Sequence, residues 1–227
     1  MSAFNTDPSG ISIQVSLSGF SFKLLPGGES SPWLGSEQLF TMPELQRRYD
    51  AVEISLLTPK VALVPESFFD GQSATEALSE VIAIEEGDHV EWVKMPEFGA
   101  VLVYSNTIGE SLSRIMAQTV LPTSGVPVQV LPEMYYILRS MSAVEEYNKI
   151  VASFRDGWLH LAIAQGKSLR LANVFRAPDF TTAQYFIFLS LKQLQLNPEI
   201  STMCLRTPVD MDSKMSLYRY FKAVVQV

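Results

Sequence analysis

Apolar residues occupy alternate positions along two short stretches near the N-terminus. The first stretch runs from Ile11 to Leu17, and the second runs from Phe20 to Leu24, with Gly19 between them. Alternation of this kind is typical of half-buried strands, because successive side chains of a strand point to opposite faces. The Ser-Gly pair between the two stretches favours a tight turn. The pattern therefore predicts a β-hairpin over residues 11–24.

Between residues 42 and 131, stretches in which apolar residues alternate are interspersed with stretches in which they recur at helical spacing. Strands are expected at 52–64, with an interruption at Thr58-Pro59, and at 90–95, 100–104 and 126–131. Helices are expected at 42–49, capped by Thr41, and at 75–84 and 107–120. The run Val61–Val64 is apolar at every position, which favours a strand buried on both faces.

A second series of elements starts near residue 150 and follows a similar order. It comprises a strand at 150–155, an Asp156-Gly157 turn, strands at 158–164 and 168–175, a helix at 182–196, a strand at 201–205, a helix at 212–221 and a strand at 223–227. Each series contains a hairpin, a third strand and helix-linked strands, so the pattern indicates an internal duplication. We expect an α/β fold with two similar lobes, residues 1–140 and 141–227.

This order of elements is similar to that of the actin, Hsp70 and sugar-kinase superfamily, in which ATP lies between two duplicated ribonuclease-H-like lobes. The stretches 11–22 and 61–69 also resemble a bacterial family, mainly from Bacteroidetes, of uncharacterised proteins assigned an actin-like ATPase fold. The resemblance implies an actin-like fold with mixed sheets flanked by helices. It implies no particular activity, because none is established for that family.

The first phosphate motif of the superfamily, Asp-x-Gly in the first hairpin, is altered in this chain. Ser16 stands at the position of the aspartate and Ser18 at that of the glycine, and Gly19 comes one position late. Serine carries no negative charge to hold Mg²⁺ with its waters. A side chain at the glycine position would occupy space that a phosphate oxygen needs.

The second phosphate motif, Asp-x-Gly-Gly-Gly, is altered in the same way. Ser153 stands at the aspartate position, and Arg155, Asp156 and Gly157 stand at the glycine positions. The adenosine motif needs a Gly-Gly pair after a strand, but the stretch 206–209 reads Arg-Thr-Pro-Val. Three altered elements together predict a scaffold that has lost ATPase activity.

Two hypotheses for function follow. The first is a non-catalytic, cytoplasmic interaction protein that binds an unknown protein partner and needs no cofactor. The alternative is a nucleotide-binding protein or ATPase that still holds ATP with magnesium in a divergent cleft between the lobes, where Arg155 would contact phosphate. That cleft would be lined by Ser16, Ser18, Gly19, Ser153, Arg155, Asp156 and Gly157.

Composition excludes several other classes of function. The formal net charge of −7 argues against a nucleic-acid partner, which requires a basic face. No apolar run approaches the length of a membrane helix, so we expect no membrane insertion. The N-terminus lacks the basic and apolar segments of a signal peptide. A single cysteine excludes an internal disulfide.

The other residues that could act in catalysis or ligand binding are expected to have structural roles instead. His89 and His160 show no metal-binding spacing and are expected to be structural or surface residues. Cys204 is expected in a buried strand, and Asp210 is expected to cap the helix at 212–221. The acidic cluster Glu80, Glu85, Glu86, Asp88 and Glu91 is expected to form a solvated helix end and turn. The aromatic helix containing Tyr185, Phe186 and Phe188 is expected in the core, with any exposed part serving a partner.

Overall fold

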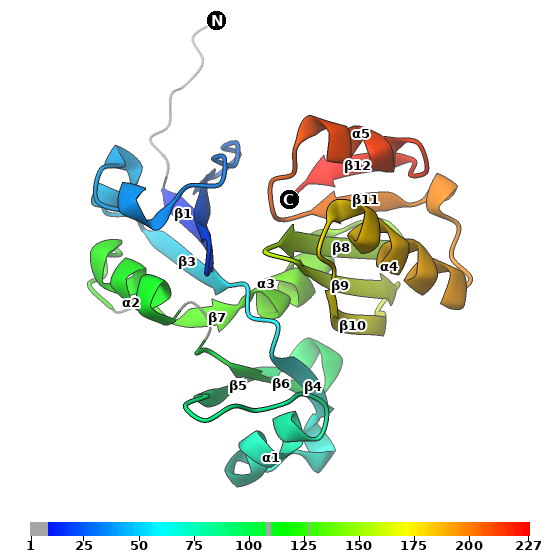
Figure 1. The fold of residues 1–227 in the computed structure, drawn as a ribbon, viewed down its shortest axis with the longest axis horizontal. Coiled ribbons are helices and arrows are strands. Elements are labelled where there is room, and N and C mark those ends of the chain that lie inside the picture. The colour runs from blue at the N-terminus through cyan, green and yellow to red at the C-terminus, as the bar shows by residue number, and fades with distance from the viewer. Residues whose placement is uncertain (1–8, 108–109, 127) are drawn as a thin grey trace, which may run out of the picture. The chain divides into compact units, whose positions relative to one another are not determined.

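The computed structural model describes residues 9–107, 110–126 and 128–227, which form two compact units (Figure 1). Unit 1 comprises Met1–Leu56 and Gly109–Leu131, and unit 2 comprises Leu57–Ile108 and Pro132–Val227. The N-terminal residues considered for a signal peptide lie outside the described part of the chain. Among the described residues, no helix combines the length and apolar character needed to cross a membrane.

Unit 1 is built on a four-stranded sheet in the order β2-β1-β3-β7. Strands β1 (Gly10–Ser16) and β2 (Gly19–Leu25) form the predicted hairpin, and β1 pairs in parallel with β3 (Ala51–Leu56). Helix α2 (Glu110–Thr119) contributes Met116 to the core of this sheet. The alternating pattern therefore predicted the hairpin correctly.

Unit 2 contains a five-stranded sheet in the order β10-β9-β8-β11-β12. Strands β8 (Asn148–Arg155), β9 (Trp158–Gln165) and β10 (Ser168–Arg176) form an antiparallel meander. Strands β11 (Thr202–Leu205) and β12 (Ala223–Gln226) then add in parallel to β8. Helices α4 (Phe180–Gln193) and α5 (Met211–Tyr218) connect these strands. All of these elements follow the predicted order.

The two sheets share one arrangement. The first strand of each, β1 or β8, pairs antiparallel with its hairpin partner and parallel with the strand that follows the meander. The third strand of the first series is reduced to isolated bridges, Phe20 with Leu34 and Lys23 with Ser30. The duplicated α/β architecture is therefore confirmed, with an incomplete meander in unit 1.

A small sheet is inserted between β3 and α2. It contains β4 (Val61–Pro65), β5 (Val90–Met95) and β6 (Ala100–Ser105) in the order β4-β6-β5, and α1 (Ala74–Ser79) packs on it. This sheet groups with unit 2, so the units do not follow the expected division after residue 140. The prediction that 61–64 is buried on both faces was wrong, because β4 lies at the edge of this sheet and its residues are half-buried.

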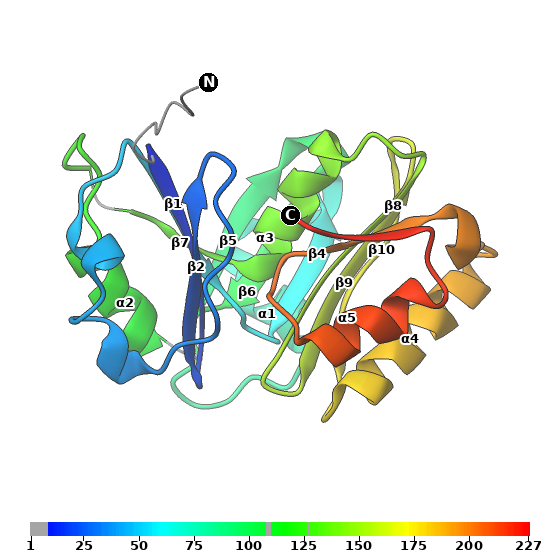
Figure 2. The same ribbon diagram turned by 90° about the horizontal axis from the view of Figure 1, so that it is seen from above.

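Helix α3 (Glu133–Ser140), which directly follows β7 (Val130–Pro132), was not predicted. It covers one face of the five-stranded sheet, and α4 and α5 cover the other face (Figure 2). The buried cluster around α3 also includes residues of the inserted sheet, such as Met95 and Leu102. Helix α3 therefore lies between two sheets of unit 2.

Three predicted elements are shorter than expected. The segment 42–49 contains only a 3-10 helix, Pro43–Gln46, and it ends where Arg47 adopts an extended conformation. Helix α1 ends at Ser79 instead of continuing to residue 84, and the strand expected at 126–131 starts at Val130. The local sequence pattern overestimated the lengths of these elements, because it does not show where their packing against the rest of the protein ends.

Candidate functional site

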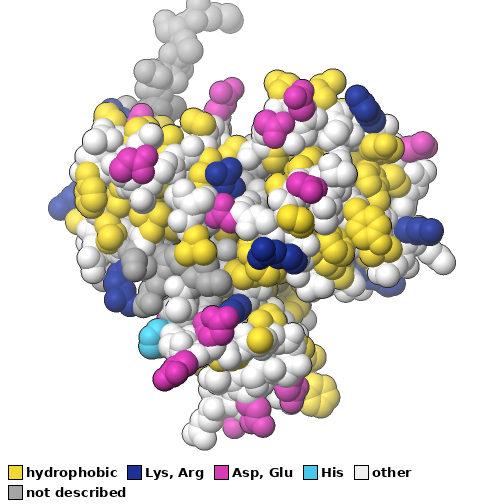
Figure 3. Space-filling model, viewed as in Figure 1, with side chains coloured by type: hydrophobic (Ala, Val, Ile, Leu, Met, Phe, Trp, Pro, Cys, Tyr) yellow, Lys and Arg dark blue, Asp and Glu magenta, His cyan; other side chains and the backbone are white. Residues whose placement is uncertain are grey.

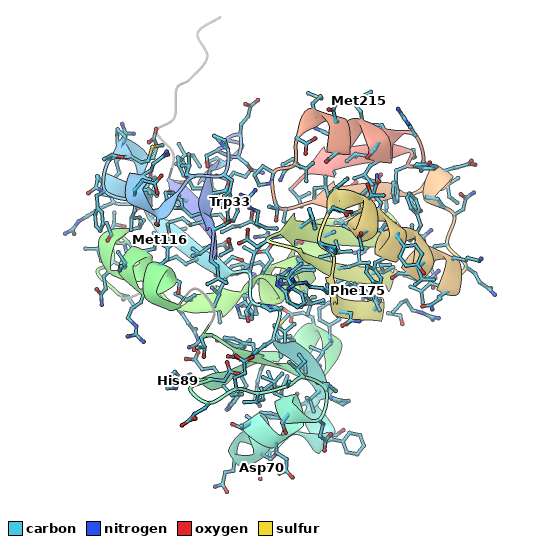
Figure 4. The ribbon with its side chains drawn as sticks, viewed as in Figure 1. Trp33, Asp70, His89, Met116, Phe175 and Met215 are labelled. Atoms are coloured by element: carbon cyan, nitrogen blue, oxygen red, sulfur yellow. The ribbon has the colours of Figure 1, made fainter. Side chains whose placement is uncertain are left out.

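The turn of the first hairpin is held by its own side chains. Ser18 donates its backbone N–H to Ser16 Oγ at 3.2 Å, and the two hydroxyl oxygens lie 3.3 Å apart. Trp33, which is labelled in Figure 4, donates its indole N–H to Ser18 Oγ at 3.0 Å. The two serines at the predicted phosphate position therefore make a local polar cluster with Trp33.

Gly19 is required by the chain that packs against it. Its φ of +136° is a conformation that L side chains rarely adopt, and a Cβ atom built there would lie 2.0 Å from the Leu34 carbonyl oxygen. The close approach is fixed by two backbone hydrogen bonds between Phe20 and Leu34, at 2.9 and 2.7 Å. Contact with the segment around Leu34 thus explains this glycine without a phosphate.

Ser153, on β8, belongs to a buried charged cluster in unit 2. Its hydroxyl donates to Glu133 Oε1 at 2.5 Å, and Arg206 Nε donates to the same oxygen at 2.9 Å. Glu133 and Ser153 are fully buried. Glu133 comes from α3 and Arg206 follows β11, so the cluster joins three elements of unit 2.

The segment after β11, where the adenosine motif was sought, is fixed through Arg206. The Arg206 N–H donates to the carbonyl of Ala152 on β8 at 2.9 Å, and its carbonyl accepts from Gln226 Nε2 on β12 at 2.8 Å. The guanidinium carbon also lies 5.5 Å from the centroid of the Tyr136 ring. Two altered motifs of the sequence, at Ser153 and at Arg206, therefore meet at Glu133.

The Asp156-Gly157 pair forms the turn between β8 and β9. Both residues have positive φ, 52° and 75°, which is the geometry of a tight two-residue hairpin turn. Arg155 Nε lies 3.6 Å from Asp156 Oδ1, and partial burial lowers the pKa of Arg155, an effect opposed by Asp156. The requirements of the turn are sufficient to explain why Asp-Gly stands here.

The structure thus brings the predicted site residues together in two groups, one in each unit. Sequence reasoning missed Glu133, although it is the centre of the buried cluster. A signal was present: Met134, Ile137, Leu138 and Met141 repeat at helical spacing directly after Pro132. That spacing predicts a helix whose first residue is Glu133.

The sequence matches one known protein family over nearly its whole length. The profile of a protein family of unknown function, DUF3822, matches residues 1–224. The chain belongs to this family. No curated protein matches the sequence significantly.

Solved structures confirm the fold of this DUF3822 chain. A Bacteroides thetaiotaomicron protein with an actin-like ATPase fold and unknown function aligns with a TM-score of 0.64, at 17% identity, over 100% of this chain and 94% of that one. The PilM-PilN type IV pilus biogenesis complex aligns with a TM-score of 0.52, at 13% identity, over 96% of this chain and 88% of that one. The predicted actin-like fold and the predicted family are therefore confirmed.

His160 of the DUF3822 chain adjoins the buried cluster. It lies on β9 opposite Ser153 of β8, is fully buried, and its Nε2 lies 2.8 Å from the carbonyl oxygen of Thr58. Its Nδ1 has no hydrogen-bond partner among the described residues. Burial lowers the pKa of His160 below its usual value, against the opposing effects of the Thr58 carbonyl and of Glu133. A neutral ring that donates to Thr58 satisfies this geometry.

Replacing His160 by glutamine is expected to flatten the dependence of stability on pH. The unfolded histidine takes up a proton below about pH 6.5, whereas the buried ring resists protonation, so native stability is full above that pH and falls below it. Thermal melting of both proteins at pH 7.5 and pH 5 measures this effect. We expect a smaller loss of Tm on acidification in His160→Gln; an equal loss would show that His160 titrates normally.

The remaining candidates are structural. Cys204 is buried in β11, and burial raises the pKa of its thiol to about 11, which disfavours the reactive thiolate. Asp210 accepts a hydrogen bond from the Ser213 N–H at 2.8 Å and caps α5 as predicted. No group of three or more His, Cys, Asp or Glu side chains within the described ranges is arranged to hold a metal ion.

The acidic cluster is only partly solvated. Glu80, Glu85, Glu86 and Glu91 are exposed as expected. The carboxylate of Asp88 is buried instead, where it binds Lys60 Nζ at 2.6 Å and accepts from Ser105 Oγ at 2.9 Å. Burial alone would raise the pKa of Asp88, but these bonds and the Glu85 N–H lower it to about 2. Asp88 therefore fastens the segment before β5 to the inserted sheet.

The aromatic helix α4 is partly exposed. Phe186 and Phe188 are half-buried and pack against the core, as predicted, but Tyr185 is 60% exposed. Hydrophobic side chains gather on the surface over α4 (Figure 3). The solvent-facing side of α4 therefore carries exposed apolar side chains (Figure 3).

Proposed function

We propose that this protein is a cytoplasmic, non-catalytic interaction protein built on an actin-like ATPase scaffold. The observation that carries the proposal is the buried cluster of Glu133, Ser153 and Arg206. It lies where the second phosphate motif and the adenosine motif of an active relative would be sought. Side chains of the protein itself use these positions for internal contacts.

The charges of this cluster are unsuited to a magnesium ion. A hard cation takes carboxylate and water oxygens as ligands, but the Glu133 carboxylate is fully buried and already paired with Arg206. An aspartate at position 153 would place a second carboxylate against Glu133, and the two like charges would repel each other. Serine at 153 donates a hydrogen bond to Glu133 and avoids that repulsion.

The first hairpin supports the same proposal. Ser16 and Ser18 bind each other, Trp33 donates to Ser18, and Gly19 is in contact with the Leu34 carbonyl. Each residue has an internal structural role that does not involve a ligand.

A partner-binding role has precedent in this fold. The PilM-PilN structure is a complex of type IV pilus biogenesis proteins, and it resembles this chain over most of its length. The likeness concerns the fold alone. It supports the idea that an actin-like scaffold can serve in an assembly, and the partner of the present chain is to be found from its own surfaces.

Thermal melting with and without magnesium and ATP tests the proposal. A ligand at 100 times its Kd stabilises the native state by about 2.7 kcal/mol, which raises Tm by several degrees. We expect a shift below about 1 °C at millimolar nucleotide, well under that range. A shift of several degrees that is abolished by Arg155→Ala, but retained by the exposed control Arg170→Ala, would support the nucleotide-binding alternative instead.

A further inference from the structure

A small cavity opens on unit 2, away from the residues of the altered motifs. It lies where the C-terminal end of α3, the turn between β9 and β10 and the 3-10 helix Pro96–Phe98 converge, and its volume is about 190 Å³. Its apolar wall is formed by Phe98, Leu138, Met141 and Ala164. Leu138, Met141 and Ala164 are buried core residues, so packing holds the wall in place.

The volume of the cavity indicates the size of its ligand. Pockets for cofactors and drug-sized molecules usually measure about 300–1,000 Å³. At about 190 Å³ this cavity is too small for a nucleotide, but it has room for one large apolar side chain. A single buried aromatic or aliphatic anchor is the usual centre of a protein-protein contact.

The charged residues around the cavity indicate which residues of the ligand would flank the inserted side chain. Arg139, Lys149 and Lys167 line the cavity together with one acidic residue, Glu97, in a protein whose formal net charge is −7. Lys149 donates to the Met141 carbonyl at 2.7 Å and belongs to the wall. Arg139 and Lys167 are exposed at the rim, where they would attract an acidic ligand and repel a basic one.

We propose that this pocket binds an acidic peptide segment of a partner protein, which inserts one aromatic or large aliphatic side chain between basic rim residues. The inference deepens the proposed interaction function by assigning it a surface and a class of partner. The apolar wall takes the anchor side chain, and Arg139 and Lys167 contact the acidic residues on either side of it. Association is therefore expected to weaken as salt is added.

Fluorescence anisotropy with three labelled peptides tests this proposal on the full chain. The probe carries one central phenylalanine between three aspartates on each side; one control peptide has alanine at the centre, and the other has asparagines in place of the aspartates. The wild-type protein should bind the probe at least about tenfold more tightly than either control, a difference of about 1.4 kcal/mol.

Matched variants assign that binding to the pocket. Arg139→Glu with Lys167→Glu should weaken binding of the probe at least about tenfold. The control pair Lys192→Glu with Arg219→Glu changes the net charge equally at exposed positions of α4 and the end of α5, and should change binding less than about twofold. Ser142→Trp, which adds bulk at an exposed lining position, should weaken binding without removing charge.

Several results would overturn the assignment. They are absence of wild-type binding up to about 1 mM probe, equal binding of the alanine peptide, or equal loss in both charge-reversed pairs. Melting curves of the variants establish that they are folded. The outcome is separate from that of the ATP experiment: a nucleotide-induced shift abolished by Arg155→Ala would support the nucleotide-binding alternative, whereas failure of the peptide alone would refute only this pocket.

Discussion

Replacing Glu133 by leucine is expected to lower the free energy of unfolding of unit 2 by about 3–5 kcal/mol, because it leaves the largely buried guanidinium of Arg206 without its counter-charge. The hydroxyl of Ser153 loses its acceptor at the same time. Urea unfolding followed by tryptophan fluorescence measures the change. In a Trp33→Phe background the remaining tryptophans, Trp92 and Trp158, both belong to unit 2.

A double variant separates the charge effect from a simple packing defect. Glu133→Leu with Arg206→Met removes both charges and keeps apolar volume, and such replacements of buried ion pairs are often close to neutral. We expect the double variant to recover most of the stability lost in Glu133→Leu. If the single variant were as stable as the wild type, or if the double variant were worse than the single one, the ion pair would not organise this region.

Replacing Gly19 by alanine is expected to destabilise unit 1 by about 2–3 kcal/mol, since the new Cβ would both strain the backbone and overlap the Leu34 carbonyl. The segment around Leu34 would have to move away from β2, at the expense of its two backbone hydrogen bonds to Phe20. Fluorescence of Trp33 in a Trp92→Phe, Trp158→Phe background reports the unfolding of unit 1.

Gly27 provides the matched control for this variant. It also has a positive φ, +74°, but a Cβ atom there would meet nothing within 4 Å. Gly27→Ala should therefore show only the conformational cost of a left-handed residue, about 1 kcal/mol. Equal effects at the two positions would mean that contact with Leu34 does not determine the need for glycine at position 19.

The sequence predicted the succession of strands and helices along the chain well, because alternation and turn residues agree along most of it. Asp156-Gly157 and Gly166 lie in the turns of the meander and fix its register in unit 2. The inserted sheet was harder to recognise, since β4, β5 and β6 have the same local pattern as strands of the main sheets. Which strands pair with which depends on contacts between distant residues that the local pattern does not contain.

The sequence singled out individual residues of the candidate site but did not predict which of them contact one another. Ser153 and the segment at Arg206 were singled out because they depart from family motifs. Their common partner, Glu133, was missed, because the short helix that carries it was not recognised. A buried carboxylate is also unexpected from sequence alone, since glutamate is rarely buried unless it is paired.

Hydrogen-deuterium exchange of the full chain with and without magnesium and ATP tests the central claim most directly, because it reports each hairpin separately. If internal contacts have replaced the phosphate-binding function, the backbone amides of 10–25 and 148–165 should exchange at the same rates in both conditions. Slower exchange at both hairpins in the presence of nucleotide would contradict the account.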